Sequence, residues 1–281
     1  MAKKVALINM KGGVGKSTLT VNLAWQFAAL HRWNKRVLVI DLDPQFNASQ
    51  YLLGVRGYQD IINKEIPTIW NLFEQLTHAP GGKRPQILDP ESFLHNVVDY
   101  GDGSRIDLVP SRLELAYSLR NPGQKEGLLR RWVAKVERKY DLILLDCAPT
   151  ESFLTSAAYL ASNFIIVPVK SEYLSSIGVS LLARSIQEFK QHYEDHKLKL
   201  AGIVFNATTD YSPEEVIAKD EVRALARKNR WYVFKEEVSY SRSYPKGARE
   251  GRPIFSTSYS RSAQAERFHA FAAEFAGRIG L

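Results

Sequence analysis

Short runs of apolar residues recur along the chain, with helical patterns between them. Most runs are continuously apolar and do not alternate with polar residues, which is typical of strands buried on both faces of a parallel sheet. Strands are predicted at Val5–Ile8, Val37–Ile40, Ile106–Val109, Leu142–Leu145, Phe164–Val167 and Ile203–Phe205. Strands that alternate with helices indicate βαβ units. The predicted fold class is therefore α/β, a doubly wound, mostly parallel sheet flanked by helices.

Two of the helical stretches carry apolar residues at helix spacing. One predicted apolar stripe comprises Leu174, Ile177, Leu181, Leu182, Ile186 and Phe189. The last helix places Phe268, Phe271, Ala272, Phe275 and Ile279 on one face. We expect this second face to pack against the sheet, because Glu266 and Glu274 balance the basic residues of the same helix and weaken any attraction to lipid.

No internal repeat or low-complexity linker divides the chain, so we expect one domain over residues 1–281. The least regular part is residues 55–104, which contains the Gly- and Pro-rich segment 79–85. We interpret 55–104 as a variable insertion on the surface of the domain.

Composition excludes several classes of protein. The 281 residues include one cysteine, which excludes an intramolecular disulfide and a cysteine-based metal cluster within one chain. No apolar run approaches the ~20 residues that span a bilayer, and we expect a cytoplasmic protein. The formal net charge is +8. Residues 1–40 hold seven basic and no acidic side chains, and residues 218–281 hold 13 basic and seven acidic ones. Such basic ends attract polyanions.

A glycine-rich segment follows the first predicted strand and precedes a helix. It reads Met-Lys-Gly-Gly-Val-Gly-Lys-Ser-Thr over residues 10–18. Glycines let backbone N–H groups converge on phosphate oxygens, and the helix presents its positive end to the anion. Lys16 is placed to reach the β- and γ-phosphates, and the Ser17 hydroxyl to ligate Mg²⁺. The predicted nucleotide-binding residues are Gly12, Gly13, Val14, Gly15, Lys16, Ser17 and Thr18.

This segment resembles the deviant Walker A motif of the ParA/MinD ATPases. The resemblance implies ATP and Mg²⁺ as cofactors, and it implies that Lys11 crosses an ATP-bridged dimer interface to the partner's phosphates. An additional cation at a shared phosphate cluster stabilises both the dimer and the charge of the transition state.

Carboxylates follow two of the predicted strands. Asp41 and Asp43 end the second strand in the sequence Asp-Leu-Asp-Pro-Gln-Phe-Asn, and Asp146 ends the fourth. Carboxylates placed opposite a phosphate loop hold Mg²⁺ waters or orient an attacking water. By resemblance to the ParA branch, Asp43 is the hydrolytic aspartate, and Asp41 and Asp146 support the metal. The chain departs from the family pattern at Phe46, where the family has glycine, and at Cys147-Ala148.

The C-terminal part carries two further predictions. Asn206 follows a strand, and by resemblance to related P-loop ATPases its amide reads adenine, although asparagine is also a common turn residue. Residues 240–262 form a basic, tyrosine-rich segment suited to contact with a phosphate backbone. We expect DNA binding there, at a distance from the phosphate loop, through Arg242, Lys246, Arg249 and Arg252. A solvated basic loop is the alternative interpretation.

The resemblance therefore implies a ParA-like ATPase. Its ATP-bound homodimer would bind nonspecific DNA, associate with the nucleoid, and release DNA when a ParB-like or other partner stimulates hydrolysis, so as to position a plasmid or chromosome. Two alternatives remain open. One is a MinD-like ATPase that acts at a membrane surface, and the other is an ATP-dependent dimerisation switch that regulates another complex.

Overall fold

A computed structural model describes residues 1–75, 87–120, 122–123, 125–172, 174–209 and 212–281. The segment 79–85, on which the predicted insertion partly rested, lies outside these residues. The remainder of 55–104 includes the end of one helix, a short helix and an edge strand. The single-domain boundary and the insertion stay predictions.

The described residues form an eight-stranded sheet in the order β3-β4-β2-β5-β1-β6-β7-β8. Only β3 runs antiparallel to its neighbour, and the other pairs are parallel. The strands are β1 (Lys3–Leu7), β2 (Arg36–Leu42), β3 (His95–Asp99), β4 (Arg105–Val109), β5 (Leu142–Cys147), β6 (Phe164–Val169), β7 (Lys199–Thr208) and β8 (Val238–Ser239). All six predicted strands are present, and the predicted fold class is confirmed.

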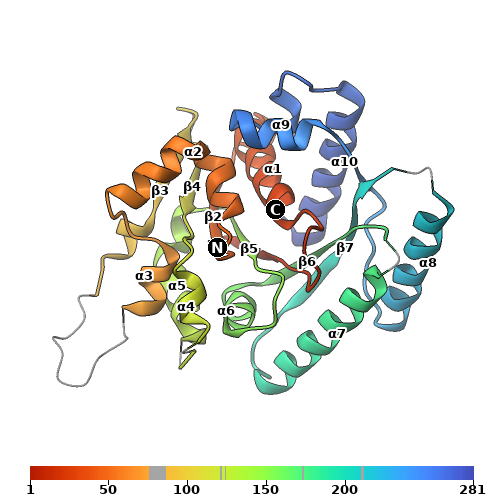
Figure 1. The fold of residues 1–281 in the computed structure, drawn as a ribbon, viewed down its shortest axis with the longest axis horizontal. Helices are drawn as coiled ribbons and strands as arrows, with labels where there is room; N and C mark the ends of the chain where they lie inside the picture. Colours follow the sequence, from red (N-terminus) through yellow and green to blue (C-terminus); the bar gives the residue numbers. More distant parts are fainter. Residues whose placement is uncertain (76–86, 121, 124, 173, 210–211) are drawn as a thin grey trace.

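Helices cover both faces of the sheet (Figure 1). Residues of α1, α2 and α10 share one core, and residues of α3, α5, α6, α7 and α8 share the other. The helices are α1 (Lys16–Ala29), α2 (Asn47–Asn63), α3 (Ile69–Glu74), α4 (Leu115–Ser118), α5 (Glu126–Val136), α6 (Phe153–Ala161), α7 (Ser175–His192), α8 (Pro213–Lys228), α9 (Ser243–Glu250) and α10 (Ser262–Ile279). Short 3-10 turns lie at Pro90–Phe93, Glu137–Lys139 and Ile254–Ser256.

The two cores explain why the apolar runs are continuous. Val5 and Leu7 of β1 belong to the core beneath α1 and α10, whereas Ala6 and the next residue after the strand, Ile8, belong to the opposite core. Successive side chains of a strand point to opposite faces, so a strand covered on both sides needs apolar residues at every position. The sheet thereby brings the carboxyl ends of β1, β2 and β5 together at its centre.

The two predicted apolar helix faces are buried to different extents. The apolar face of α10 is buried in the core, as expected. The stripe of α7 is divided, because Leu182, Ile186 and Phe189 are buried while Leu174, Ile177 and Leu181 are 53–55% exposed. The six positions span about 180° of the helix, and the core covers only part of that arc.

Within the described residues, no helix is long and apolar enough to cross a membrane.

Candidate functional site: a phosphate loop and its carboxylates

The phosphate loop joins β1 to α1 and is held by its glycines. Gly15 precedes the first residue of α1 with φ of 85°, a left-handed conformation that favours glycine. A Cβ at this position would also lie 2.2 Å from the amide nitrogen of Asn206. Gly15 is therefore required both by its backbone conformation and by the close approach of β7. The loop presents the amino end of a 14-residue helix to solvent, as anion binding demands.

Lys16 is buried, and its ammonium group points back over the loop. It donates to the carbonyl oxygens of Asn9, at 3.2 Å, and of Lys11, at 3.3 Å. Burial lowers the pKa of Lys16, and the negative charges of Asp146 and Asp43 oppose this effect. The ammonium group has only neutral carbonyl partners at these distances, so an anion seated in the loop would be its strongest partner.

Asp41 and Asp146 are direct neighbours across β2 and β5. Both are fully buried. Asp41 accepts hydrogen bonds from the backbone N–H of Asp43 at 3.0 Å, and from the N–H and hydroxyl of Ser49 at 2.9 and 2.7 Å. Burial nevertheless raises the pKa of Asp41 to about 7. The pKa of Asp146 is raised well above its ordinary value, first by burial and then by the charge of Asp41.

One oxygen of Asp146 is left without a partner. Its Oδ1 accepts a 3.3 Å hydrogen bond from Thr20, but its Oδ2 is buried and has no hydrogen bond in the structure. Two adjacent buried carboxylates with an unused oxygen form a donor set that suits a hard divalent cation and its waters. Mg²⁺ therefore fits these residues. A bound Mg²⁺ would supply the positive charge that these two carboxylates lack, next to the Ser17 hydroxyl, whose proximity lowers the pKa of Asp146.

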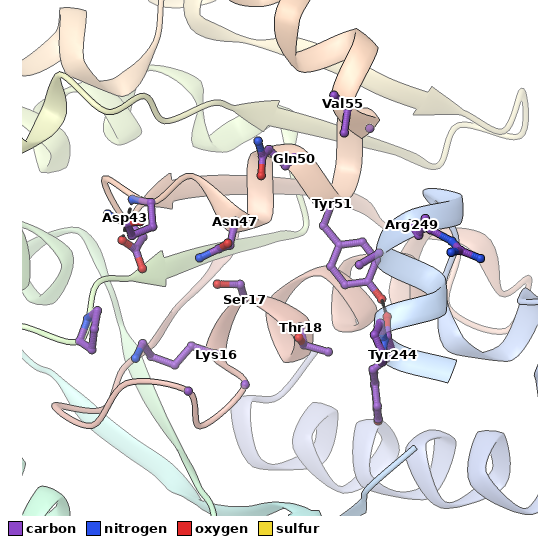
Figure 2. Close-up of a pocket in the computed structure, with 17 residues that line it drawn as sticks. Lys16, Ser17, Thr18, Asp43, Asn47, Gln50, Tyr51, Val55, Tyr244 and Arg249 are labelled. Atoms are coloured by element: carbon purple, nitrogen blue, oxygen red, sulfur yellow. Dashed lines mark hydrogen bonds between the residues drawn. The ribbon is translucent and has the colours of Figure 1, made fainter. Parts of the chain in front are cut away.

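A cavity of about 720 Å³ opens above these residues (Figure 2). Asp43 lines it opposite Lys16 and Ser17. The Oδ1 of Asp43 accepts from the backbone N–H of Gln45 at 2.9 Å, which fixes the turn after β2. Gly13, Gly15 and Thr18 also line the cavity. Val14 is buried beneath the loop, and Gly12 is exposed at its surface. The structure thus brings together the predicted phosphate loop and the predicted carboxylates.

Comparison with known proteins supports this interpretation. A family model described as an AAA domain matches residues 2–200. The chain belongs to this family, and it is of the ParA/Soj type. The chromosome-partitioning ATPase Soj of Treponema pallidum is 28% identical, over 100% of this chain and 99% of that protein. The sporulation initiation inhibitor protein Soj of Bacillus subtilis is also 28% identical, over 90% of each chain.

Solved structures agree on the fold. Apo McdA from Cyanthece has a TM-score of 0.77 at 16% identity and covers 98% of this chain and 99% of that one. A plasmid partition protein from Borrelia burgdorferi, bound to AMPPNP, has a TM-score of 0.72 at 20% identity, with 98% of each chain covered. Cobyrinic acid a,c-diamide synthase from Mycobacterium smegmatis, with bound ADP and magnesium, has a TM-score of 0.69 at 23% identity. The match covers 97% of this chain and 93% of that one.

Lys11 of this ParA/Soj-type chain forms an ion pair within its own protomer. Its ammonium nitrogen lies 2.8 Å from a carboxylate oxygen of Glu172, which follows β6. The hydrogen bond from Lys11 lowers the pKa of Glu172, and Lys170 adds a second positive charge at 3.7 Å. The Glu172 side chain is 52% exposed, so this pair is at the surface. The role of Lys11 in a second protomer stays a prediction.

Asn206 supports the phosphate loop in this structure. Its amide donates a 2.8 Å hydrogen bond to the carbonyl oxygen of Val14, and the side chain is buried against Gly15. Asn206 does not line the 720 Å³ cavity. Contact between Asn206 and adenine remains a prediction, and in this structure the amide serves the loop backbone.

The four predicted DNA-binding residues have different surroundings in the structure. Arg242 lines a separate cavity of about 290 Å³ together with Arg261 and Tyr259. Lys246 pairs with Glu250 at 3.2 Å and lies over the ring of Tyr259. Arg252 is exposed. Arg249, in contrast, lines the same cavity as Lys16 and Ser17 (Figure 2). The expected separation of these residues from the phosphate loop is therefore wrong for Arg249, because α9 folds back over α2.

Several residues that sequence patterns did not identify also hold the site. The Asn9 side chain accepts from the Lys11 N–H at 2.9 Å and donates to the Pro168 carbonyl at 2.8 Å, so it fixes the start of the loop. Ser49 supports Asp41, and its hydroxyl accepts from the N–H of Ser111 at 2.9 Å. Asn9 and Ser49 each lie beside a recognised motif, and a polar residue next to buried chemistry is the only signal that the sequence offers for them.

Proposed function

We propose that this protein is a ParA-like ATPase that hydrolyses ATP to ADP and phosphate with Mg²⁺. The observation that carries the proposal is the convergence of Lys16, Ser17 and Asp43 on one cavity above two buried carboxylates. A buried cation, an exposed helix amino end and a pair of under-compensated carboxylates are complementary to the phosphates and the metal ion of a nucleoside triphosphate.

The residues divide the chemistry among them. Lys16 and the loop N–H groups would neutralise the β- and γ-phosphates. Ser17 would ligate Mg²⁺, and Asp41 and Asp146 would hold the waters of the metal ion, which places positive charge where charge develops during hydrolysis. Asp43 would orient the attacking water, since it lines the cavity opposite Lys16 and Ser17. Positioning and electrostatic stabilisation supply most of the catalysis in phosphoryl transfer.

ATP would also join two protomers. Lys11 lies at the rim of the loop, and its present partner is an exposed carboxylate. An exposed ion pair contributes about 0–1 kcal/mol, so Lys11 can exchange Glu172 for the phosphates of a second protomer at little cost. Partner-stimulated hydrolysis, by a ParB-like or other protein, would then separate the protomers.

The dimer would bind nonspecific DNA through its basic C-terminal surface. Arg242 and Arg252 are exposed, and Lys246 lies between them in the sequence, where the negative charge of Glu250 offsets its positive charge. Arg261 shares a cavity with Arg242 and adds to the same positive surface. Contacts of this kind neutralise phosphates without reading bases, and the position of a plasmid or chromosome on the nucleoid would follow from cycles of binding and release.

The experiment is retention of DNA by the purified protein, with ATP and Mg²⁺, with ADP and with no nucleotide, across a salt series. Retention that needs ATP and whose logarithm falls linearly with log salt supports the proposal, with a slope of about −0.9 per neutralised phosphate. The double variant Arg242→Glu/Arg261→Glu should lose retention but still dimerise with ATP. Equal retention with and without ATP, or none at low salt, would reject DNA transport.

The same assay distinguishes the alternatives. A MinD-like ATPase would be retained by anionic liposomes in the presence of ATP. The buried apolar face of α10 argues against that helix as a lipid anchor, because Phe268, Phe271 and Phe275 have no exposed surface to insert. ATP-dependent dimers that bind neither DNA nor liposomes would favour a regulatory switch.

A further inference from the structure

The exposed half of the α7 stripe lies at the amino end of that helix. Leu174, Ile177 and Leu181 are 53%, 55% and 55% exposed. At spacings of three and four residues they lie on one side of the helix, next to the face that Leu182 and Ile186 bury in the core. We call these three residues the apolar strip. A row of apolar side chains in contact with water is typical of a surface that binds another molecule.

The apolar strip begins beside the phosphate loop. Gly178 of α7 packs closely on that loop, since a Cβ there would lie 3.1 Å from the Asn9 side-chain oxygen and 3.4 Å from the Lys11 Cβ. Glu172, which pairs with Lys11, stands two residues before Leu174 in the sequence. The amino end of α7 is therefore held against the loop residue that the proposed function places at the contact with a second protomer.

The contact of a lysine with phosphates is too small to hold two protomers together by itself. Stable interfaces bury about 800 Å² on each partner, and their centres are more apolar than their rims. Because Lys11 lies next to the amino end of α7, a protomer whose phosphates it reaches is also brought close to the apolar strip. The strip supplies the kind of surface that the centre of an interface contains.

The charges around the apolar strip suit a second copy of the same chain. At one end Lys11 pairs with Glu172 at 2.8 Å, and beyond the other end Arg184 pairs with Glu188 at 2.7 Å. A two-fold contact places a surface patch against its own copy, so the patch must be complementary to itself. A strip with a cation and a carboxylate at each end meets this condition, whereas charges of one sign would repel their copies.

We propose that Leu174, Ile177 and Leu181 form an apolar part of the contact between two ATP-bound protomers. The inference rests on the proposed function, in which ATP joins two copies of this chain, and it names a surface that the copies bury. Burial of the strip would stabilise the dimer by removing apolar side chains from water, in addition to the attraction between Lys11 and the phosphates.

Thiol accessibility tests the burial directly, because the one cysteine of the chain, Cys147, is buried. The control position is Ile217, which is 59% exposed on α8, the helix packed beside α7 (Figure 1). Ile177→Cys should react with a chromogenic disulfide reagent at least about 10-fold more slowly with AMPPNP and Mg²⁺ than without, and the protection should increase with protein concentration, as mass action requires. Ile217→Cys should react equally under both conditions.

Substitution by glutamine tests the energetic contribution. Ile177→Gln places a neutral, polar side chain on the strip, and a two-fold interface then loses two apolar side chains. The dissociation constant of the AMPPNP-bound dimer, measured by light scattering, should therefore rise at least about 10-fold. Ile217→Gln is the matched control, and Ile177→Leu keeps an apolar side chain, so both should dimerise as the wild type does. The melting temperature without nucleotide should be the same in all of these variants, because both positions are exposed.

Three outcomes would overturn the inference. One is normal dimerisation of Ile177→Gln, and another is a thiol at position 177 that reacts equally with and without AMPPNP. Either result would assign the apolar strip to a partner other than a second copy. The third is an equal loss of dimers in Ile217→Gln, which would show that α7 has no special part in the contact. If the wild type bound no AMPPNP, or stayed monomeric with it, the proposed function would fail instead.

Discussion

Phe46 stacks on Tyr58, with ring centroids 4.8 Å apart and ring planes 5° from parallel. Phe46 has φ of 45°, a left-handed conformation that costs an ordinary residue roughly 1–2 kcal/mol. Its N–H also donates to the Asp43 carbonyl at 2.8 Å. The stack therefore stabilises a strained turn at the position where the family has glycine, three residues after the proposed hydrolytic aspartate.

A double-mutant cycle tests this relationship. Phe46→Gly relieves the strain but loses the stack, so we expect the free energy of unfolding to change by less than about 1 kcal/mol. Tyr58→Ala should destabilise the wild type by more than it destabilises Phe46→Gly, with a coupling of about 0.5–1.5 kcal/mol. Tyr58→Phe is the control, since it keeps the ring and loses only the 3.1 Å bond to the Ser111 carbonyl. Additive effects measured by urea unfolding would disprove the coupling.

The unpartnered oxygen of Asp146 predicts a conflict between stability and function. With a raised pKa, Asp146 binds its proton more tightly in the folded than in the unfolded chain, so its contribution to stability is lost as pH rises through the folded-state pKa. Without metal at pH 7.5, Asp146→Asn should therefore raise the melting temperature by about 3 °C or more, and the gain should shrink towards pH 5.

Asp146→Asn should also lose the stabilisation that Mg²⁺ and ATP give to the wild type, because the variant lacks the carboxylate. Asp60→Asn, an exposed carboxylate of α2, is the control and should leave the melting temperature unchanged. A lower melting temperature for metal-free Asp146→Asn at pH 7.5 than for the wild type would contradict the prediction. Differential scanning fluorimetry at the two pH values is sufficient.

Asp43 is assigned to the attacking water and not to the phosphates. Asp43→Ala should therefore bind ATP with nearly wild-type affinity, form dimers that persist, and hydrolyse ATP at least about 100-fold more slowly. Phosphate release and light scattering measure the two effects separately. Hydrolysis at the wild-type rate would show that another group orients the water.

Lys11 and Glu172 provide a matched pair of substitutions. Lys11→Ala should bind ATP as a monomer and fail to dimerise, because the proposed contact with the second protomer is gone. Glu172→Gln removes only an exposed ion pair worth about 0–1 kcal/mol, so the protein concentration needed for ATP-dependent dimers should fall by no more than about 5-fold. Normal dimers of Lys11→Ala would refute its role across the interface.

Patterns of neighbouring residues in the sequence were sufficient to predict the strands, the phosphate loop and the carboxylates opposite it. The continuous apolar runs predicted the strands because a sheet covered on both faces demands apolar residues at successive positions. The glycine-rich loop between a strand and a helix predicted the phosphate site, since glycine conformations and helix amino ends are encoded in neighbouring residues. The carboxylates Asp41, Asp43 and Asp146 were predicted to lie opposite the loop because the carboxyl ends of parallel strands meet at one edge.

Tertiary structure alone decided which partners the remaining side chains meet. Asn206 supports the Val14 carbonyl because β7 passes beneath the loop. Half of the α7 stripe stays exposed because the core covers only part of that helix. Arg249 lies more than 230 positions after Lys16 in the sequence, and it lines the same cavity because Tyr51 holds α9 against α2 and Asn22 holds the turn that follows α9. A basic segment has the same composition whichever way it folds, so only the packing of distant segments decides that Arg249 lines the cavity beside the phosphate loop.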